Sequence, residues 1–306
     1  MRVLIVARCK EGRYAPFITE QVDAIKKAGV DCQCFGFSKK GILGYLRNRH
    51  GLKKAIESFQ PDLIHAHYGL CGLLANSQRR IPVITTYHGS DINNPRVLRL
   101  SRLAIDLSAY NIFVSRKNIE TAKPKGDNYS LIPCGINLGD YSMIDRLKAR
   151  ESMGLRSDRK YVLFSGAFDN QVKNAPLAKN AVSLLPDVEL LELKGYTRQQ
   201  VATLMQAVDT LIMTSFTEGS PQVIKEALAC GCPVVSVDVG DVREMTTGIE
   251  GCFLADRTPA SLAENLQKAF DFGKRTGGRS AIFDKGLTND LIATKLLSIY
   301  NSVFSK

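Results

Sequence analysis

Residues 210–237 read TLIMTSFTEGSPQVIKEALACGCPVVSV, and this stretch decides the fold. An apolar run, Thr210–Thr214, is followed by a polar loop with one glycine, and Pro221 is well placed at the first position of a helix. The helical pattern ends at Gly231, and a second apolar run, Val234–Val237, follows. Short apolar runs on either side of a helix predict a β-α-β unit whose parallel strands are buried on both faces.

The same alternation runs along the whole chain. The first half predicts strands at Val3–Ala7, Asp31–Phe37, Leu63–His67, Val83–Tyr87, Tyr110–Val114 and Tyr129–Ile132. The second half predicts strands at Tyr161–Ser165, Glu189–Leu193, Thr210–Thr214, Val234–Val237 and Cys252–Ala255. Helical patterns separate them, which indicates an α/β protein with two doubly wound, Rossmann-like domains.

Helix ends and turn residues suggest the domain limits. Ile18–Ala28 is a helical pattern, and Thr258 is placed to cap a helix that reaches about Phe272. The stretch 133–160 is rich in charge and turn residues, so we place the domain boundary near Leu155. We expect a first domain at 1–155, a second at 156–275, and a segment at 276–306 whose helix, about Asn289 to Phe304, packs back on the first domain.

Length and composition exclude several classes of protein. A chain of 306 residues with 44% hydrophobic and 23% charged residues is an ordinary globular protein, which excludes disorder and coiled coil. No apolar run is long enough to span a bilayer, and Met1 leads directly into a strand pattern, so we expect a cytoplasmic protein without a signal peptide. The eight cysteines form no C-x-x-C pair, so we expect reduced thiols and no metal site.

The charge is uneven. The chain has 41 Lys and Arg against 30 Asp and Glu, a net charge of +11, and residues 1–155 carry 24 against 13 of these. A basic run at 38–54, interleaved with apolar residues, contains Lys39, Lys40, Arg47, Arg49, Lys53 and Lys54 and no acid. Such a segment is typical of contact with an anionic membrane surface, and the alternative is a solvated helical face. Nucleic acid is a third reading, set aside because no RNA- or DNA-binding motif is present.

Two glutamates flank a candidate anion site. Glu218 follows a parallel strand, at the edge where open α/β sheets bind ligands. The helix that follows offers N–H groups and partial positive charge to a phosphate, and Glu226 lies about a turn and a half into it. A sugar nucleotide, with hydroxyls on either side of a diphosphate, has the matching layout. The alternative is that both glutamates are ordinary surface residues.

Glu218, seven intervening residues, Glu226 and the following Ala-Leu-Ala-x-Gly-x-Pro-Val-Val resemble the E-x7-E signature of retaining GT-B glycosyltransferases of the group 1, GT4-like family. The resemblance implies two domains facing each other across a cleft. It also implies that Glu218 holds the donor sugar, that Glu226 holds the ribose, and that the diphosphate is lined by Gly219, Ser220 and Pro221.

Other segments resemble the same family. After the strand Tyr161–Ser165 the family has a Gly-Arg…Lys pair, and here Ala167 stands at the arginine position while Lys173 remains as a phosphate contact. Tyr196 is placed to stack on the base, and Gly12 stands where the family has paired glycines near the diphosphate. For Lys173 and Tyr196 the alternative is an ordinary surface residue.

Residues 85–91, TTYHGSD, resemble the T-x-H-G-S-D segment of the family, which implies that His88 contacts the donor sugar. Asp91 either shares that role or caps a helix. His65 is interpreted as structural and His67 as an acceptor-side residue. Arg13 is a candidate for the phosphate charge that Ala167 does not supply, with a solvated loop arginine as the alternative.

The resemblance implies a retaining transfer of a hexose from a UDP- or GDP-sugar. No D-x-D motif stands at a predicted strand end with a suitable partner carboxylate, so we expect metal-independent catalysis without a cofactor. The expected acceptor is a lipid-linked or surface polysaccharide or lipopolysaccharide precursor, and the expected place is the cytoplasm, at the inner face of the membrane. Two alternatives stay open. One is a nucleotide-sugar epimerase on the same fold, and the other is a catalytically weak binding subunit of a glycosylation complex.

Overall fold

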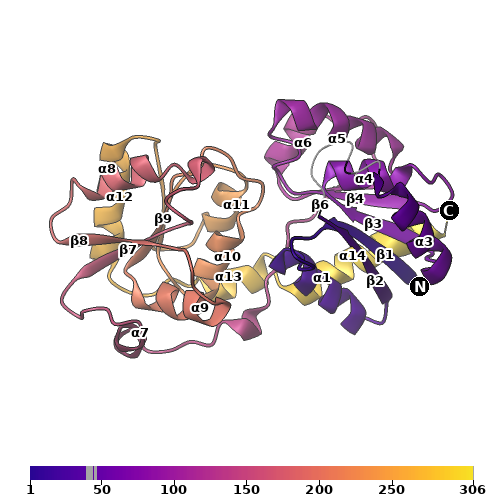
Figure 1. Cartoon of the computed structure of the whole chain (residues 1–306). Coiled ribbons are helices and arrows are strands. Elements are labelled where there is room, and N and C mark those ends of the chain that lie inside the picture. The colour runs from indigo at the N-terminus through magenta and orange to yellow at the C-terminus, as the bar shows by residue number, and fades with distance from the viewer. Residues whose placement is uncertain (39–43, 45–46, 306) are drawn as a thin grey trace. The chain divides into compact units, whose positions relative to one another are not determined.

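The computed structural model describes residues 1–38, 44 and 47–305, and the chain divides into two compact units. Unit 1 comprises Met1–Gly135 and Asn289–Lys306, and unit 2 comprises Ile136–Thr288. Each is built on one parallel sheet with helices between the strands (Figure 1). All eleven strands predicted from the sequence are present, with bounds that agree to within one residue, and the α/β class is confirmed.

Unit 1 has a six-stranded sheet in the order β2-β1-β3-β4-β5-β6, in which every neighbouring pair is parallel. The elements are β1 (Arg2–Arg8), α1 (Pro16–Lys27), β2 (Asp31–Phe37), α3 (Arg49–Phe59), β3 (Leu63–His67), α4 (Gly69–Asn76), β4 (Val83–Tyr87), α5 (Pro95–Leu107), β5 (Tyr110–Phe113), α6 (Arg116–Ala122), β6 (Tyr129–Leu131) and α14 (Asn289–Phe304).

Strand β1 shows why the interior of a central strand in this sheet is a continuous apolar run. Val3 and Ile5 belong to the cluster on one face of the sheet, which α1 and α14 cover. Leu4 and Val6 belong to the cluster on the other face, which α3 and α4 cover. Because successive side chains point to opposite faces, a strand covered on both sides is favoured to be apolar at consecutive positions, as Val3–Ala7 is.

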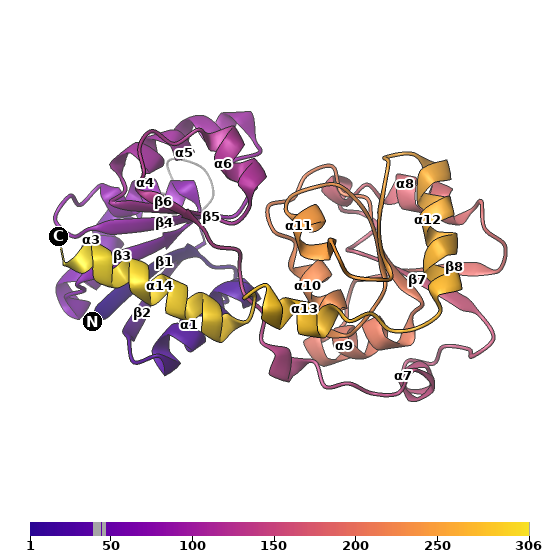
Figure 2. The ribbon, with the colours of Figure 1, turned by 180° about the vertical axis from the view of Figure 1, so that it is seen from behind.

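Helix α14 belongs to unit 1, although it follows the whole of unit 2 in the chain. It runs beside α1 across the sheet of unit 1 (Figure 2). Its apolar stripe places Ile292, Leu296 and Tyr300 in the same cluster as β1. The helix has the bounds that the sequence pattern predicts.

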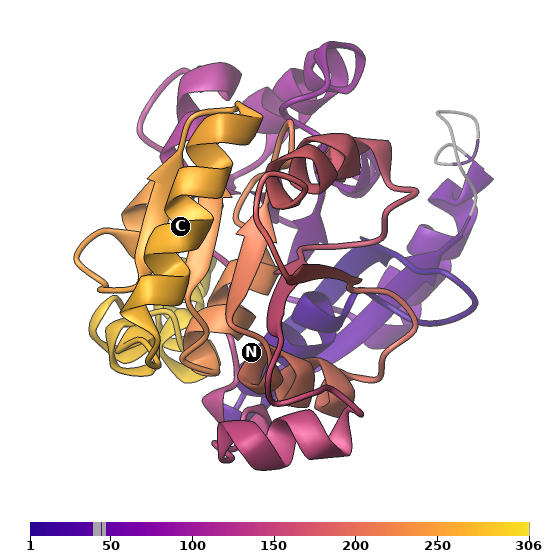
Figure 3. The same cartoon turned by 90° about the vertical axis from the view of Figure 1, so that its left-hand side faces the viewer.

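Unit 2 has a five-stranded parallel sheet in the order β11-β10-β9-β7-β8. Helices lie on either side of it, as Figure 3 shows. The elements are η1 (Leu138–Asp140), α7 (Arg146–Ser152), β7 (Lys160–Phe164), η2 (Gln171–Lys173), α8 (Ala175–Val182), β8 (Val188–Glu192), α9 (Arg198–Ala207), β9 (Thr210–Met213), α10 (Gln222–Ala229), β10 (Val234–Val237), α11 (Val242–Thr246), β11 (Cys252–Ala255), α12 (Pro259–Phe272) and α13 (Gly278–Asp284).

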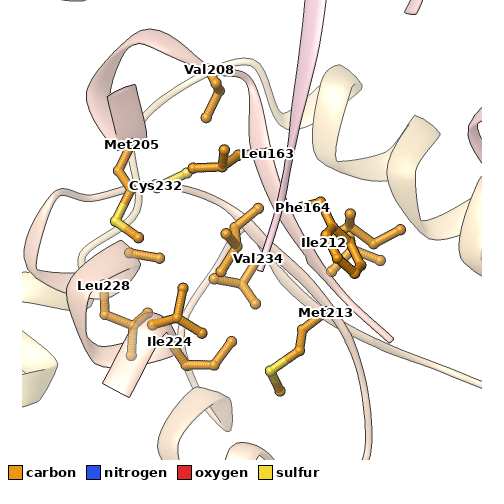
Figure 4. Close-up of a cluster of buried hydrophobic side chains, with 14 of the residues drawn as sticks. Leu163, Phe164, Met205, Val208, Ile212, Met213, Ile224, Leu228, Cys232 and Val234 are labelled. Carbon is orange, nitrogen blue, oxygen red and sulfur yellow. The ribbon is translucent and has the colours of Figure 1, made fainter. Parts of the chain in front are cut away.

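The core of unit 2 lies between β9 and the helices next to it. Ile224 and Leu228 of α10 are fully or almost fully buried there, with Met205 of α9 on the same side, while Ile212 of β9 lies next to Phe164 of β7 (Figure 4). Thr258 caps α12 as predicted, since its side chain accepts a hydrogen bond from the Ser261 N–H. The packed core fixes the start of α10 against the end of β9.

The division between the units falls at Gly135 and Ile136 rather than near Leu155. The cause is side-chain packing that a turn-rich sequence does not reveal. Tyr141 is fully buried in the core of unit 2. Arg150, 4% exposed, donates to the carbonyl of Ala207 at 2.9 Å and pairs with Asp209 at 2.8 Å. At the other end, only Asn289 onward belongs to unit 1, so the segment expected at 276–306 is divided between the units.

Candidate functional site

The loop that joins β9 to α10, residues 214–221, lies at the carboxyl edge of the sheet of unit 2. Two hydrogen bonds of 2.9 Å tie Thr214 Oγ1 to the carbonyls of Lys173 and Asn174. The N–H of Phe216 donates to the carbonyl of Val172 at 2.9 Å. The loop is therefore fastened to the turn that follows β7, so that the segments after two neighbouring strands form one surface.

Lys173 and Glu218 meet on this surface. Lys173 Nζ lies 2.7 Å from Glu218 Oε1, and the two side chains are 19% and 17% exposed. The stem of Lys173 passes close to Gly166, where a Cβ would lie 3.1 Å from Lys173 Cγ. The structure thus brings together two residues that the sequence assigns to neighbouring parts of one ligand.

The start of α10 departs from expectation in one detail. Pro221 occupies the position before the helix, with extended backbone angles, and Gln222 is the first helical residue. Gly219 is buried, and Glu226 lies half-buried in the second turn of the helix. The first N–H groups of a helix have no partner within it, so this end of α10 offers donors to an anion.

Ser220 is held by two side chains that the sequence reading did not single out. Its hydroxyl donates to Asp241 Oδ2 at 2.6 Å and accepts from Lys225 Nζ at 2.7 Å. Lys225 is fully buried, and Asp241 is 5% exposed. Leu228 and Ala229, three and four residues after Lys225, are core residues, so Lys225 stands on the apolar stripe of α10. That placement is the signal that could have found it.

Tyr196 and Arg257 lie at the periphery of the site. Tyr196 is 38% exposed and follows β8, the edge strand, which β7 separates from β9. Arg257 Nη1 donates to the carbonyls of Thr214 and Ser215 at 3.1 and 2.6 Å, so it supports the first residues of the loop. Ala167 leaves the arginine position of the expected Gly-Arg pair without a charge.

Unit 1 holds a row of three histidines at the corresponding edge of its sheet. His65 is fully buried, with Nδ1 2.6 Å from the hydroxyl of Tyr300 and Nε2 2.7 Å from Thr86 Oγ1. His67 Nδ1 lies 3.0 Å from His88 Nε2, and the ring centroids of the row are 4.6 and 5.2 Å apart. Burial lowers the pKa of His67 to about 3, so this ring is neutral at physiological pH.

Asp91 fixes the loop that carries His88. Its carboxylate accepts from the N–H groups of His88 and Gly89, both at 3.0 Å, and from Gly69 at 2.9 Å. Burial raises its pKa to about 6, and the backbone hydrogen bonds oppose that rise. The helix that begins at Pro95 is capped by Asn94, so Asp91 is not its cap.

Backbone strain marks the same edge. Tyr68 has φ of 75°, an unfavourable conformation for a bulky residue, and its ring centroid lies 4.7 Å from that of His88. A cavity of about 340 Å³ is lined here by Arg8, Tyr68 and Asp91 among others.

The turn that contains Gly12 is a tight hairpin. Lys10 and Arg13 exchange two backbone hydrogen bonds of 2.9 Å, and Glu11 and Gly12 have φ of 51° and 77°. Gly12 therefore serves the turn geometry, which favours glycine at that position. Arg13 lies on the rim of a second cavity, of about 450 Å³.

Neither a metal cluster nor a membrane span was found in the described part of the chain. No three His, Cys, Asp or Glu side chains among these residues could hold one metal ion. No described helix is long and apolar enough to cross a bilayer. None of the eight cysteines, all of which are described, forms a disulfide.

Two family models match the chain. Residues 13–140 match Glycosyltransferase Family 4, and residues 162–271 match Glycosyl transferases group 1. Together they cover most of both units, and the chain belongs to the group 1 glycosyltransferases, whose fold is GT-B.

Named relatives agree with this family. The chain is 27% identical over 237 residues to the putative teichuronic acid biosynthesis glycosyltransferase TuaC of Bacillus subtilis, a match covering 68% of this chain and 61% of that protein. It is 23% identical over 287 residues to a D-inositol 3-phosphate glycosyltransferase of Mycolicibacterium gilvum, covering 76% and 64%. The chain thus spans somewhat less than two thirds of the length of these relatives.

Solved structures share the fold. Sucrose-phosphate synthase of Thermosynechococcus elongatus superposes with a TM-score of 0.85 at 17% identity, over the full length of both chains. Anabaena HepE, solved in complex with UDP, gives 0.79 at 18% identity, covering 99% of this chain and all of that one. A UDP-GlcNAc 2-epimerase from Methanocaldococcus jannaschii gives 0.64 at 12% identity, covering 99% and 100%.

Proposed function

We propose that this protein is a retaining, metal-independent glycosyltransferase that moves a hexose from a UDP- or GDP-sugar to an acceptor hydroxyl. The observation that carries the proposal is the Lys173–Glu218 pair beside the amino end of α10. It places a cation, a helix end and a carboxylate together, and these suit a diphosphate and a sugar hydroxyl. HepE, a structural relative, is named in complexes with UDP and with UDP-glucose.

Each site residue then has a role toward the donor. Lys173 and the backbone N–H groups of Gly219 and Ser220, in the loop that Pro221 ends, stabilise the charge that develops on the leaving diphosphate. Glu226 binds the ribose diol and Glu218 binds sugar hydroxyls. Tyr196 is proposed to stack on the base. No cofactor is required in this scheme.

His88 of unit 1 is proposed to contact the donor sugar. His67 and Asp91 hold its ring and its backbone, so that the imidazole has a fixed orientation. Gly12 is proposed to lie near the diphosphate, and the positive φ of its turn also favours glycine at that position.

The acceptor is proposed to be a lipid-linked or surface polysaccharide or lipopolysaccharide precursor, met at the inner face of the membrane. The name of TuaC refers to teichuronic acid biosynthesis, and another structural relative is a lipopolysaccharide outer core galactosyltransferase. The basic segment supports membrane contact, with Arg47, Arg49, Lys53 and Lys54 exposed. Lys39 and Lys40, the other two, lie outside the described residues.

A groove beside α3 adds to this membrane proposal. It has a volume of about 660 Å³, an apolar lining from Leu52, Ile56 and Ile81, and basic residues around it. Charge and apolar surface together are what an anionic lipid surface attracts.

The test is a thermal-shift panel of UDP-, GDP- and ADP-sugars, followed by a transfer assay with the donor that binds. A bound donor raises the unfolding temperature by mass action. The anomeric configuration of the product, read by NMR, decides between retention and inversion. If no nucleotide or nucleotide sugar shifts the unfolding temperature, the donor site is misassigned.

Two other functions remain as outcomes of the same assay. An epimerase would convert the donor without an acceptor, and one epimerase shares the fold with a lower TM-score than the transferases named above. A weak binding subunit would bind the donor without turnover until a partner protein is added. The uncharged Ala167 is the observation that favours this second alternative.

A further inference from the structure

Lys225 stands where charged residues are rarely found. It is fully buried within unit 2, in the second turn of α10, and its neighbours on the same stripe are core residues. A buried ammonium group is costly unless polar partners compensate it. The role of Lys225 can therefore be inferred from the groups that its ammonium contacts.

Two of those partners lie at the amino end of α10. Helical side chains lean toward the amino end, which brings Lys225 Nζ to Ser220 Oγ at 2.7 Å and to Gln222 Oε1 at 3.0 Å. One cation thus ties the last residues of the loop to the first residue of the helix.

Asp241 completes the arrangement from a different loop. Its Oδ2 accepts the Ser220 hydroxyl proton at 2.6 Å. Oδ1 is buried and has no hydrogen-bond partner among the described residues. Burial raises the pKa of Asp241 to about 6, while the charge of Lys225 and the hydrogen bond from Ser220 oppose the rise.

The backbone of the Asp241 loop also touches the β9–α10 loop. At Gly240, where φ is +58°, a Cβ would lie 2.5 Å from the carbonyl oxygen of Gly219. Only glycine allows that approach, so the two loops are in contact through main chain as well as side chains.

We propose that Lys225 and Asp241 are positioning residues for the diphosphate: through Ser220 they hold the main chain of Gly219–Gln222 in the conformation that presents its N–H groups to the anion. The Ser220 hydroxyl gives its single proton to Asp241, so it does not donate to a ligand in this arrangement. Ser220 thus acts on the phosphate through the backbone. The inference rests on the proposed donor site.

The experiment compares ligands that differ only in phosphate. Uridine, UMP and UDP are titrated by calorimetry into the wild type and into Ser220→Ala, Lys225→Met and Asp241→Asn. We expect about a tenfold loss of UDP affinity for Ser220→Ala and Lys225→Met, a smaller loss for UMP, and unchanged uridine affinity. Asp241→Asn keeps an acceptor for Ser220, so it should retain most of the UDP affinity.

Lys268→Met is the matched control, because Lys268 is an exposed lysine of α12 that pairs with Glu264 of the same helix at 2.8 Å. Thermal unfolding is followed for every variant, and Ser220→Ala keeps the test valid if Lys225→Met does not fold. The inference is overturned if Ser220→Ala binds UDP like the wild type, or if uridine affinity falls as far as UDP affinity. If the wild type binds none of UDP, GDP and ADP, the proposed function itself fails.

Discussion

Lys173 Nζ lies 2.7 Å from Glu218 Oε1, so the residue assigned to phosphate and the residue assigned to the sugar are partners of each other. The pair is mostly buried, whereas the pair of equal length between Lys194 and Asp169 has side chains 54% and 72% exposed. Chain geometry therefore couples two functions that the sequence treats separately, and either substitution changes the surroundings of the other residue.

The first prediction concerns this pair. Lys173→Met should lower UDP affinity about tenfold, because a charge-assisted contact to phosphate is lost. Glu218→Ala should lower turnover about 100-fold, because a contact that strengthens in the transition state is lost. Isothermal titration and a transfer assay measure the two effects. Lys194→Met is the control, and the assignment is wrong if Lys173→Met and Lys194→Met affect UDP binding equally.

The second prediction concerns Glu226, whose substitution should affect ligands with and without phosphate alike. Since it is assigned to the ribose, Glu226→Ala should weaken uridine and UDP by a similar factor, about tenfold or more. Parallel titrations with both ligands measure this, and Glu264→Ala on α12 serves as a surface control. A loss confined to UDP would move Glu226 from the ribose to the phosphate.

His67 predicts how unit 1 responds to acid. Its pKa is lowered to about 3 in the folded protein, while the unfolded chain takes up a proton near pH 6.5. The unfolded state therefore binds more protons between these values, and stability falls as the pH drops from 6.5 toward 3.

Removing this titration should reduce the acid sensitivity. Between pH 7 and pH 5, His67→Gln should lose about 2 kcal/mol less stability than the wild type does. Urea unfolding at the two pH values measures the difference, and His50→Gln, an exposed histidine, should behave like the wild type. Equal pH dependence for wild type and His67→Gln would show that His67 does not titrate as described.

The basic segment predicts a charge-dependent attachment. Replacing Arg47, Arg49, Lys53 and Lys54 with glutamine should lower binding to anionic liposomes at least tenfold, at about 1 kcal/mol per basic residue near the surface. Thermal stability should stay unchanged, because these side chains are exposed. Replacing Lys39 and Lys40 as well should lower binding to anionic liposomes further.

A matched variant separates local from total charge. Arg116, Lys117, Lys123 and Lys125 also lie in unit 1, and replacing them removes the same number of charges. Liposome sedimentation of both variants decides the question. If the two lose binding equally, total charge rather than the α3 segment is responsible.

The charge difference between the halves becomes larger when the units of the structure are used. Unit 1 carries 23 Lys and Arg against 11 Asp and Glu, and unit 2 carries 18 against 19. The proposed donor site thus lies in a unit without net positive charge. Its cations, Lys173 and Lys225, are local and are held beside carboxylates.

The strands and most helices could be predicted because each depends on a pattern of residues that are close together in the sequence. Short segments such as Leu63–His67 and Val83–Tyr87, between helical patterns, match strands that are covered on both faces, and Thr258 marks the start of its helix as an N-cap residue. The unit boundary could not be predicted, since it depends on Tyr141 and Arg150 packing against residues far along the chain.

Some residues of the candidate site could likewise be predicted from the sequence, and others could not. Glu218 and Glu226 stand out by their spacing along one segment. Asp241 does not, because its partner Ser220 is 21 residues away and the contact exists only when β10 lies beside β9. Lys225 does not stand out in the sequence either, because a lysine on a helix is usually exposed.

Helix α14 has a consequence for how the molecule is made. The sequence of unit 1 is interrupted by all of unit 2, and one face of its sheet receives Ile292, Leu296 and Tyr300 only from the final helix. On the ribosome, unit 2 has its complete set of strands and helices while one face of the sheet of unit 1 is covered by α1 and still lacks α14. Because domains fold as units during synthesis, the basic half of the protein, which begins first, is completed last.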